Sequence, residues 1–492
     1  MRVDVKVSDV EAGLAAAAAA FADALPASVK LPAGAGKTHL LAATVRHIVA
    51  DGGTVLVLTH TNAGVHAIQE RLKRFGVTSS VRVATLTSFA FVLVRAYPVL
   101  GRMRVPELPI WSDSSAYITA AHRVATSSNI RDVLAASFTH VLVDEYQDCS
   151  EDQHALVCAL AGAIPTTGVL GDPMQAIFGF KDTTLITWDA VTDRFPDHPT
   201  HVKPWRWVGH NEALGAWLLD LRTQLVAGRQ ITFHQLDSAL AVTYRSSAGN
   251  FRAVPEVVLN GRWPASESVV VLTAWKTTVR PIAGKLNGRF TVMEEIAGDF
   301  MLKALTELAG LDPEGYAGWL YKLSKECTCG HTKLNDPVKS GLAKGKTVGH
   351  LVRPGLEQAL AGFDAVVTEP SFASLADAMN TIMKSPALRL HSHEAWFDIQ
   401  AALVGAVAAG DDPSALTEEL ARARDRLRRQ GRRDRSRVVS RTLLVKGLEY
   451  DHVVIDNIER TTDVNNLYVA LTRARKSITV IGDTHTITVT AT

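Results

Sequence analysis

The sequence predicts an α/β protein built on two parallel β-sheets that are flanked by helices. Short apolar runs alternate with segments of helical periodicity, and several of these runs end in glycine or polar residues. This rhythm is typical of parallel sheets, which bind ligands at the carboxyl ends of their strands. The strand runs fall into two groups, and this indicates two lobes.

The first group of strands lies in the N-terminal half of the chain. Residues 54–59 form a buried-strand run, and a helix is expected over residues 63–75. Residues 141–143 and 168–170 repeat the strand pattern. The mostly alanine run at residues 14–21 is flanked by acidic residues and is too short to cross a bilayer. It predicts a helix rather than a targeting segment.

The second group of strands is expected at residues 268–273, 438–439, 452–456 and 477–482. We therefore expect a first lobe over residues 1–200, with an insertion near residues 91–137. A second lobe is expected over residues 201–492, with an insertion near residues 290–436. Both insertions are expected to be small and mostly helical.

Composition agrees with an ordinary globular protein of several domains. The chain has 492 residues, of which 47% are hydrophobic and 21% charged, so it can bury a large core. Its net charge of +2 means that any hold on nucleic acid must come from local patches. Four cysteines make a disulfide framework improbable and suit a reducing compartment. A cytoplasmic location without a membrane partner is the expectation.

A phosphate-binding loop is predicted near the N-terminus, where a short apolar run is followed by Gly34-Ala35-Gly36-Lys37-Thr38. The glycines let backbone N–H groups approach phosphates, Lys37 reaches the β- and γ-phosphates, and the Thr38 hydroxyl binds Mg²⁺. The usual loop pattern begins with a small residue. Here that position is Leu31, which is followed by Pro32.

Two acidic residues complete the predicted nucleotide site. Asp144 and Glu145 follow the apolar strand at residues 141–143. Asp144 is expected to bind the metal, and Glu145 to accept a proton from the attacking water. An acidic surface cluster is the alternative. Because the acids end a strand in a chain with a phosphate-binding loop, NTP hydrolysis is the preferred interpretation.

Four segments extend this pattern in a fixed order. They are residues 141–148 (VLVDEYQD), 169–180 (VLGDPMQAIFGF), 442–451 (TLLVKGLEYD) and 467–475 (LYVALTRAR). Together with the phosphate-binding loop they resemble the ordered motifs of the UvrD/Rep/PcrA-like helicases of superfamily 1A. The resemblance implies two RecA-like P-loop NTPase lobes. It also implies an ATP- and Mg²⁺-dependent DNA helicase or translocase, which moves 3′ to 5′ on single-stranded or tailed duplex DNA.

The resemblance also implies roles for residues in the nucleotide site. Gln175 would sense the γ-phosphate, and Arg206 would reach the same phosphate. Arg473 would stabilise transition-state charge from across the cleft between the lobes. Trp205 would stack on the nucleotide base, and Glu449 would contact the ribose side. The alternative for any single arginine is a surface ion pair.

Base recognition is where the sequence departs from the family. Relatives carry a glutamine shortly before the phosphate-binding loop, whereas residues 1–37 contain none. His39, which is expected to line the nucleotide site, stands where the family has an arginine. Recognition would then depend mainly on stacking against Trp205, which any purine can provide. Weak discrimination between ATP and other purine nucleotides is the expectation.

By the same resemblance, DNA contacts are expected from Thr61, Asn62, Ser88, Phe89, Phe178 and Phe180. Hydroxyl, amide and backbone groups would hold phosphates, and the Phe180 ring would stack on a base. Two alternatives remain open: the polar residues could cap helices, and Phe178 could belong to the core. The arginine-rich segment 422–437 is either a DNA contact or a solvated face. Cys327, Cys329 and His331 are too few for a structural zinc site.

Two other functions are alternatives to the DNA helicase or translocase. A DNA- or partner-activated regulatory ATPase would share every motif. A nuclease–helicase is less expected, because the chain ends shortly after the Arg473 motif and leaves no room for a C-terminal nuclease domain. A nuclease or another protein remains a possible partner.

Overall fold

The computed structural model describes residues 7–107, 109–110, 113–179, 184–247, 253–295, 298–351, 353–430, 435–461 and 463–489. The chain forms two compact units. Unit 1 comprises Met1–Gln230, Asp463–Arg475 and Val489–Thr492, and unit 2 comprises Ile231–Thr462 and Lys476–Thr488.

This division differs from the predicted lobe boundary at residue 200. Unit 1 continues to Gln230 because α10 (Glu212–Val226) packs against η4 (Trp205–Trp207) and α20 (Val464–Leu471). For the same reason Asp463–Arg475 belongs to unit 1, although it follows most of unit 2 in the sequence.

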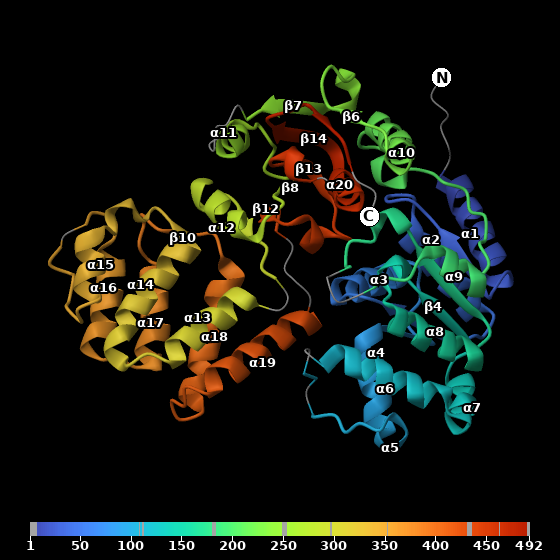
Figure 1. The fold of residues 1–492 in the computed structure, drawn as a ribbon, viewed down its shortest axis with the longest axis horizontal. Helices are drawn as coiled ribbons and strands as arrows, with labels where there is room; N and C mark the ends of the chain where they lie inside the picture. Colours follow the sequence, from blue (N-terminus) through green and yellow to red (C-terminus); the bar gives the residue numbers. More distant parts are fainter. Residues whose placement is uncertain are drawn as a thin grey trace. The chain divides into compact units, whose positions relative to one another are not determined.

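Unit 1 contains a five-stranded parallel sheet (Figure 1). In spatial order its strands are β1 (Ala27–Lys30), β5 (Thr167–Gly171), β4 (His140–Val143), β2 (Val55–Thr59) and β3 (Val81–Thr85). The sequence predicts β2, β4 and β5, and the structure confirms them. It does not predict the four-residue β1 or the partly exposed β3.

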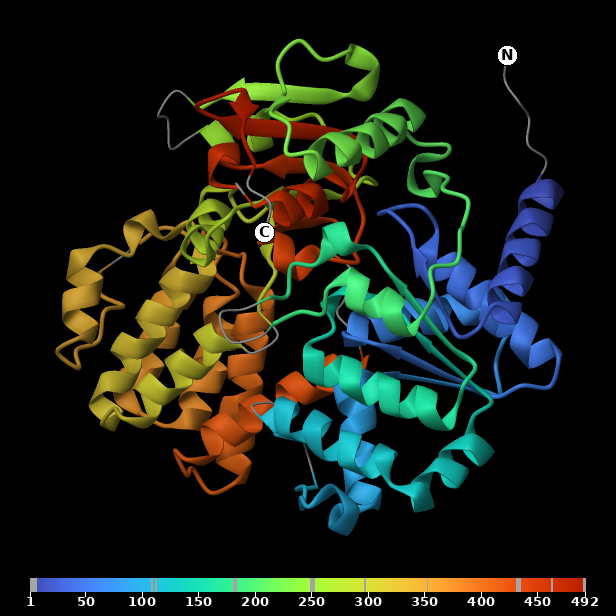
Figure 2. The same ribbon diagram turned by 45° about the vertical axis from the view of Figure 1, so that its right-hand side comes forward.

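Alternate residues of the central strands face two separate cores. Leu56 and Val141 belong to one core, and Val57 and Leu142 belong to the other. Because successive strand residues point to opposite faces, both faces need covering. Helices do this on each side (Figure 2). The helices of this part of unit 1 are α1 (Val7–Asp23), α2 (Lys37–Ala50), α3 (Asn62–Arg74), α4 (Leu86–Ala96), α5 (Pro98–Gly101), α6 (Ser114–Thr126), α7 (Ser128–Ser137) and α8 (Glu151–Ala163), of which α5, α6 and α7 pack on other helices.

The sequence predictions for these helices agree with the structure. The alanine-rich run lies in α1, the helix expected over residues 63–75 is α3, and the insertion near residues 91–137 is helical. Shorter elements complete unit 1. They are η2 (Tyr146–Asp148), η3 (Pro173–Gln175), α9 (Trp188–Arg194) and η4, followed by α10 and, near the C-terminus, α20.

Unit 2 contains a six-stranded sheet. Its spatial order is β7 (Val242–Ser246), β14 (Ala474–Gly482), β13 (Tyr450–Ile455), β8 (Val269–Leu272), β12 (Arg437–Ser440) and β9 (Thr291–Val292). The pairs of β8 with β12 and β13, of β12 with β9, and of β7 with β14 are parallel. The four strands predicted for this half are therefore confirmed. The chain has the predicted α/β fold of parallel sheets flanked by helices.

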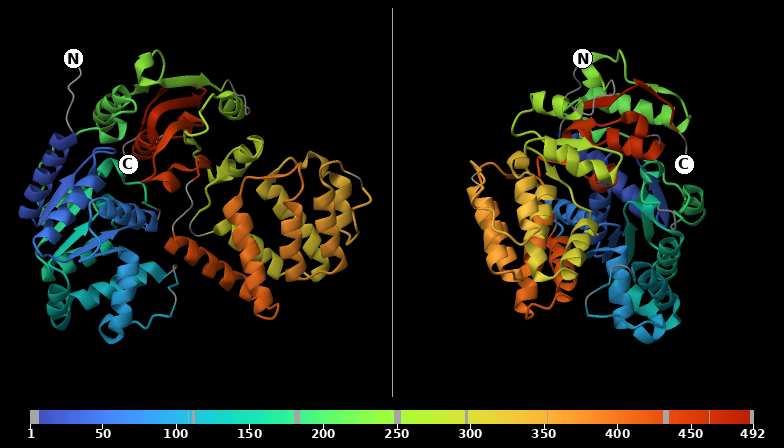
Figure 3. Two further views of the ribbon diagram at one scale, coloured as in Figure 1. Left: turned by 180° about the vertical axis from the view of Figure 1, so that it is seen from behind. Right: turned by 60° about the vertical axis from the view of Figure 1, so that its left-hand side comes forward.

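Helices dominate the rest of unit 2. Two of them, α11 (Ala253–Asn260) and α12 (Lys276–Lys285), adjoin the sheet, and α12 leads from β8. The insertion forms a helical bundle around its own core (Figure 3). Its helices are α13 (Asp299–Ala309), α14 (Tyr316–Cys327), α15 (Asp336–Leu342), α16 (Glu357–Thr368), α17 (Phe372–Ile382), α18 (His393–Ala408) and α19 (Ala415–Gln430). Two short antiparallel pairs, β10 (Thr328–Cys329) with β11 (Arg389–Leu390) and β6 (Ile231–Thr232) with β15 (Thr486–Ile487), complete the unit.

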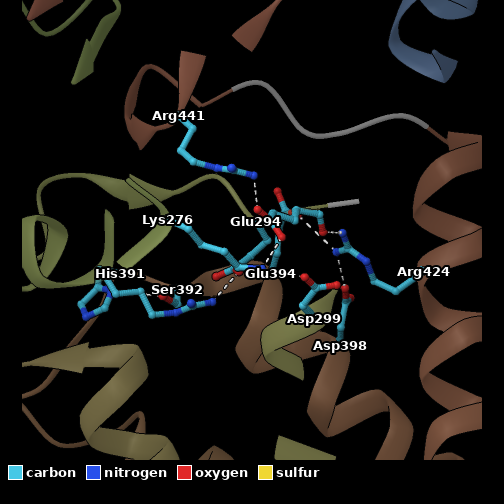
Figure 4. Close-up of polar contacts among 11 residues, drawn as sticks. Lys276, Glu294, Asp299, His391, Ser392, Glu394, Asp398, Arg424 and Arg441 are labelled. Carbon is cyan, nitrogen blue, oxygen red and sulfur yellow. Dashed lines mark hydrogen bonds and ion pairs between the residues drawn. The ribbon is translucent and has the colours of Figure 1, made fainter. Parts of the chain in front are cut away.

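An ion-pair cluster joins this bundle to the sheet of unit 2 (Figure 4). Arg424 on α19 is buried, and it pairs with Glu394 at 3.3 Å and Asp398 at 2.8 Å. It also donates to the backbone carbonyl of Glu295 at 2.7 Å, while the Glu295 carboxylate pairs with Arg441 after β12. Arg424 belongs to the arginine-rich segment, and its contacts are structural rather than open to nucleic acid.

Two further features concern metal binding and membranes. The four cysteines are free thiols, and no three His, Cys, Asp or Glu side chains among the described residues are grouped to hold a metal. Within the same ranges, every helix is too short or too polar to cross a lipid bilayer.

Candidate active site

The phosphate-binding loop connects β1 to α2 in unit 1. The helix begins at Lys37, and its N-cap is Gly36, whose φ of 89° lies in the left-handed region. No side chain caps this helix, and its first turn carries no acidic residue. The first N–H groups of a helix lack partners within the helix, and its N-terminus favours anions. The loop therefore has the local structure of a phosphate site.

The two glycines of this loop lie directly against the segment Trp205–Trp207. A Cβ atom on Gly34 would come within 2.5 Å of the Trp207 ring, and one on Gly36 within 2.9 Å of the Trp205 ring. The Arg206 backbone N–H donates to the Gly34 carbonyl at 3.1 Å. Close packing and positive φ thus both require glycine here. Trp205 is accordingly placed beside the loop.

The acidic pair lies at the carboxyl end of β4, facing Lys37. Lys37 Nζ is 3.0 Å from Glu145 Oε1 and 4.0 Å from Asp144 Oδ1, and the lysine is only 8% exposed. Burial alone would lower the pKa of Lys37, but Glu145, Asp144 and Asp172 outweigh it and raise that pKa. Lys37 is therefore a buried ammonium group beside two carboxylates.

A chain of hydrogen bonds leads from this ion pair to Arg473. Gln147 donates to Glu145 Oε2 at 2.5 Å, and Gln147 Oε1 accepts from the Asp172 backbone N–H at 2.9 Å. Gln175 donates to Asp172 Oδ2 at 2.9 Å, and Gln175 Oε1 accepts from Arg473 Nη2 at 3.0 Å. All of these residues belong to unit 1. Segments far apart in sequence thus meet in one connected polar network.

Both predicted arginines lie in unit 1. Arg473 is 1% exposed, and its Nε donates to the Val469 carbonyl at 2.9 Å. Arg206 donates to the Thr472 carbonyl. Asp463–Arg475 packs with unit 1 through α20, and the role expected of Arg473 across the cleft stays a prediction.

Thr38 and Asp144 fit the expected magnesium site in their chemistry. Thr38 is partly exposed at the start of α2, and the Asp144 side chain is 6% exposed beside Lys37. Hydroxyl and carboxylate oxygens suit Mg²⁺, which usually binds through few protein ligands together with waters and substrate phosphates. Such a site does not need a cluster of three acidic or imidazole side chains.

His39 and Glu449, both expected at the nucleotide site, belong to unit 1 and unit 2 respectively. His39 hydrogen-bonds to Arg71 and lies edge-on to Phe75, with ring centroids 6.5 Å apart, so it contacts α3. Glu449 is exposed in unit 2, just before β13.

The expected polar DNA contacts include two residues engaged at helix starts. Thr61 is the N-cap of α3 and accepts from the Gly64 backbone N–H at 3.0 Å, so the capping alternative is confirmed for this residue. The Ser88 backbone N–H donates to Thr85, the N-cap of α4, at 3.0 Å. Thr61, Asn62 and Ser88 are all partly exposed.

The three aromatic residues that are expected to contact DNA differ in where they lie. Phe89 is 3% exposed and its ring belongs to the core of unit 1, so a DNA contact at this position would have to come from its backbone and stays a prediction. Phe178 is partly exposed. Phe180 lies outside the described residues.

Several residues of this site were not predicted from the sequence. Gln147 and Asp172 stand inside the recognised motifs, and that position is the signal that could have identified them. Trp207 is wholly buried and donates to the Ala474 carbonyl at 2.7 Å. Tyr468 accepts from the Ala33 backbone N–H at 3.1 Å, and Arg222 pairs with Asp172.

Comparisons with known proteins agree with the ordered motifs. A model of the UvrD/REP helicase N-terminal domain matches residues 111–196, and a model of the UvrD-like helicase C-terminal domain matches residues 444–481. An ATP-dependent helicase/nuclease subunit from Lacticaseibacillus casei is 41% identical over 78 residues, as is its counterpart from Lacticaseibacillus paracasei. Each match covers 15% of this chain and 6% of the relative.

A crystal structure of the Pif1 helicase from Candida albicans aligns with 96% of this chain and 94% of its own, at 12% identity and a TM-score of 0.43. A likeness at that score adds nothing to the assignment. The two matched domain models and the curated relatives, taken with the motifs, support a UvrD/Rep-like helicase.

Proposed function

We propose that this chain is an ATP-dependent DNA helicase or translocase of superfamily 1A, which moves 3′ to 5′ along single-stranded DNA. The observation that carries the proposal is the hydrogen-bonded network from Lys37 through Glu145, Asp172 and Gln175 to Arg473. It joins the lysine expected to bind phosphate, a carboxylate suited to act as base, the glutamine expected to sense the γ-phosphate, and an arginine.

Lys37 and Glu145 would exchange partners when ATP binds. The lysine would leave its 3.0 Å contact with Glu145 for the phosphates, whose charge is greater. Glu145 would then be free to accept the proton of the attacking water. The Thr38 hydroxyl and the Asp144 carboxylate would hold Mg²⁺, which neutralises phosphate charge when bound.

Gln175 and Arg473 would act as a pair at the γ-phosphate. Because the Gln175 amide and the Arg473 guanidinium are hydrogen-bonded at 3.0 Å, a displacement of the amide would also displace the guanidinium. A preorganised arginine stabilises the charge that develops in phosphoryl transfer. Arg206 would supply a second positive charge, and its backbone is already bonded to the loop at Gly34.

Coupling to DNA would run through the segment that follows Gln175. Phe178 is three residues away in the same segment and partly exposed, and Phe180 lies two residues further. A shift of Gln175 on hydrolysis would displace these rings and any base stacked on them. Thr61, Asn62 and Ser88 would hold the DNA backbone without reading its sequence.

A strand-displacement assay with 3′-tailed and 5′-tailed duplexes tests this function. The expected result is ATP-dependent displacement from the 3′-tailed duplex, absent in Glu145→Gln. ATP hydrolysis stimulated by DNA without displacement from either substrate would favour the regulatory ATPase instead. Displacement only from the 5′-tailed duplex would contradict the direction.

A nuclease partner belongs to the same proposal. The two curated relatives are named as subunits of an ATP-dependent helicase/nuclease, although this chain spans only 6% of their length. Purification of the tagged chain from its own cells, followed by assays for ATP-dependent degradation of DNA, tests the partnership. Recovery of the chain without any nuclease activity would contradict it.

A further inference from the structure

Arg222 lies on α10, a helix that carries none of the recognised motifs. Its Nη1 atom is 2.6 Å from Asp172 Oδ1. The arginine side chain is 17% exposed and the aspartate side chain is fully buried. A buried carboxylate needs a counter-charge and hydrogen bonds, and Arg222 supplies both to Asp172.

The second oxygen of Asp172 sets the orientation of Gln175. Oδ2 accepts from Gln175 Nε2 at 2.9 Å, while Oδ1 accepts from Arg222 and from the Met174 backbone N–H. An ionised carboxylate can only accept hydrogen bonds, so the amide NH₂ of Gln175 must face it. The amide oxygen is thereby turned to Arg473, which can only donate.

Arg222 also borders α20, the helix that ends two residues before Arg473. Its guanidinium carbon is 5.2 Å from the centroid of the Tyr468 ring on α20. The Tyr468 hydroxyl accepts from the Ala33 backbone N–H in the phosphate-binding loop. Burial raises the pKa of Tyr468 to about 12, so its hydroxyl stays neutral at physiological pH. One side chain therefore contacts both the aspartate that orients Gln175 and the helix that precedes Arg473.

We propose that Arg222 is a positioning residue for ATP hydrolysis, which acts by holding Asp172 so that Gln175 presents its amide oxygen to Arg473. The inference rests on the proposed function. Without Arg222, Asp172 Oδ1 loses the charged donor that lies 2.6 Å from it. The carboxylate is then free to turn, and Gln175 Nε2 loses the acceptor that keeps its amide oxygen toward Arg473.

The alternative is that Arg222 only stabilises the fold, and kinetics separate the two. A structural role would lower the fraction of active protein, whereas loss of positioning lowers kcat in a folded protein and leaves KM for ATP nearly unchanged. Arg222→Lys keeps the charge but loses the planar fork, and Arg222→Met keeps the length without the charge. Asp220→Asn is the matched control, because Asp220 is exposed on the same helix.

The test is steady-state ATP hydrolysis by the full chain with saturating single-stranded DNA. We expect Arg222→Met to lower kcat by about 100-fold, because a displacement of reacting groups by about 1 Å can lower the rate by that factor. Arg222→Lys should lower kcat by roughly tenfold, between wild type and the Met variant. Asp220→Asn should match wild type. Thermal unfolding of each variant gives the folded fraction.

A double-mutant cycle with Gln175→Ala makes the test independent of folding. If Arg222 acts through Gln175, Arg222→Lys should change kcat by less than about twofold once Gln175 is alanine. An equal loss in both backgrounds, or a wild-type kcat in Arg222→Met, would overturn the inference alone. A wild-type chain without DNA-stimulated hydrolysis would overturn the proposed function, and this inference with it.

Discussion

The Arg473 guanidinium donates to the side-chain carbonyl of Gln175 at 3.0 Å, across 298 residues of sequence. Both side chains are buried, so water competes little for this bond. Two segments that the sequence places in different halves of the chain thus share one hydrogen bond. Substitution at either residue should disturb the other.

Lys37→Ala and Glu145→Gln should both abolish turnover, but at different steps. Lys37→Ala removes positive charge from the phosphates and should weaken ATP binding. Glu145→Gln should still bind ATP with magnesium, because the amide keeps its shape but cannot accept the proton. Titration with a fluorescent ATP analogue measures binding, and phosphate release measures turnover. Wild-type turnover in Glu145→Gln would remove this residue from its proposed role.

Arg473→Ala should leave ATP binding largely intact and lower kcat by roughly 10³-fold, as for other arginine fingers. Rates with and without DNA should fall together. Arg473→Lys is the matched variant, since it keeps the charge but cannot reproduce the bonds to both Gln175 and Val469. An unchanged kcat with a raised KM would make Arg473 a binding residue instead.

Phe180→Ala should retain basal ATP hydrolysis and weaken binding to single-stranded DNA. One stacked base contributes about 1–3 kcal/mol, and translocation should suffer with it. Phe89→Ala is the contrasting variant, because Phe89 is in the core and its truncation should cost about 3–5 kcal/mol of stability. Fluorescence anisotropy and thermal unfolding separate the two. A collapse of the unfolding temperature in Phe180→Ala would assign that ring to the core.

GTP or dATP should support DNA-stimulated hydrolysis within about tenfold of ATP in kcat/KM, a gap below about 1.4 kcal/mol. Residues 1–37 contain no glutamine to read the adenine edge, and Trp205 lies beside the loop at Gly36. A site without hydrogen bonds to a distinguishing edge discriminates poorly. Competition assays with the three nucleotides check this expectation. A hundredfold preference for ATP over GTP would mean that other groups recognise adenine.

Much of the fold could be predicted from the sequence, because central parallel strands are nearly continuous apolar runs. The strands β2, β4, β5 and β8 are buried except at His140, and each contains consecutive apolar residues. β3 could not be predicted in this way, since its position at the sheet edge leaves it partly exposed. The division into units was missed because α20 packs against α10, a contact between distant segments.

The residues of the site divide along a similar line. Lys37, Asp144, Glu145, Gln175 and Arg473 stand in motifs, so local sequence reveals them. Arg222 is one basic residue on an ordinary helix, and only the fold brings it to Asp172. The burial of the Phe89 ring could not be predicted, because a motif fixes a position in the chain but not the direction of a side chain, which core packing decides.

The rate of ATP hydrolysis as a function of oligothymidine concentration tests whether the nucleotide site is coupled to a path for single-stranded DNA. We expect a slow basal rate that rises at least about tenfold to a plateau with DNA, and no such rise in Glu145→Gln. A wild-type rate that does not change at any DNA concentration would contradict this coupling, and an undiminished rate in Glu145→Gln would contradict the role of Glu145.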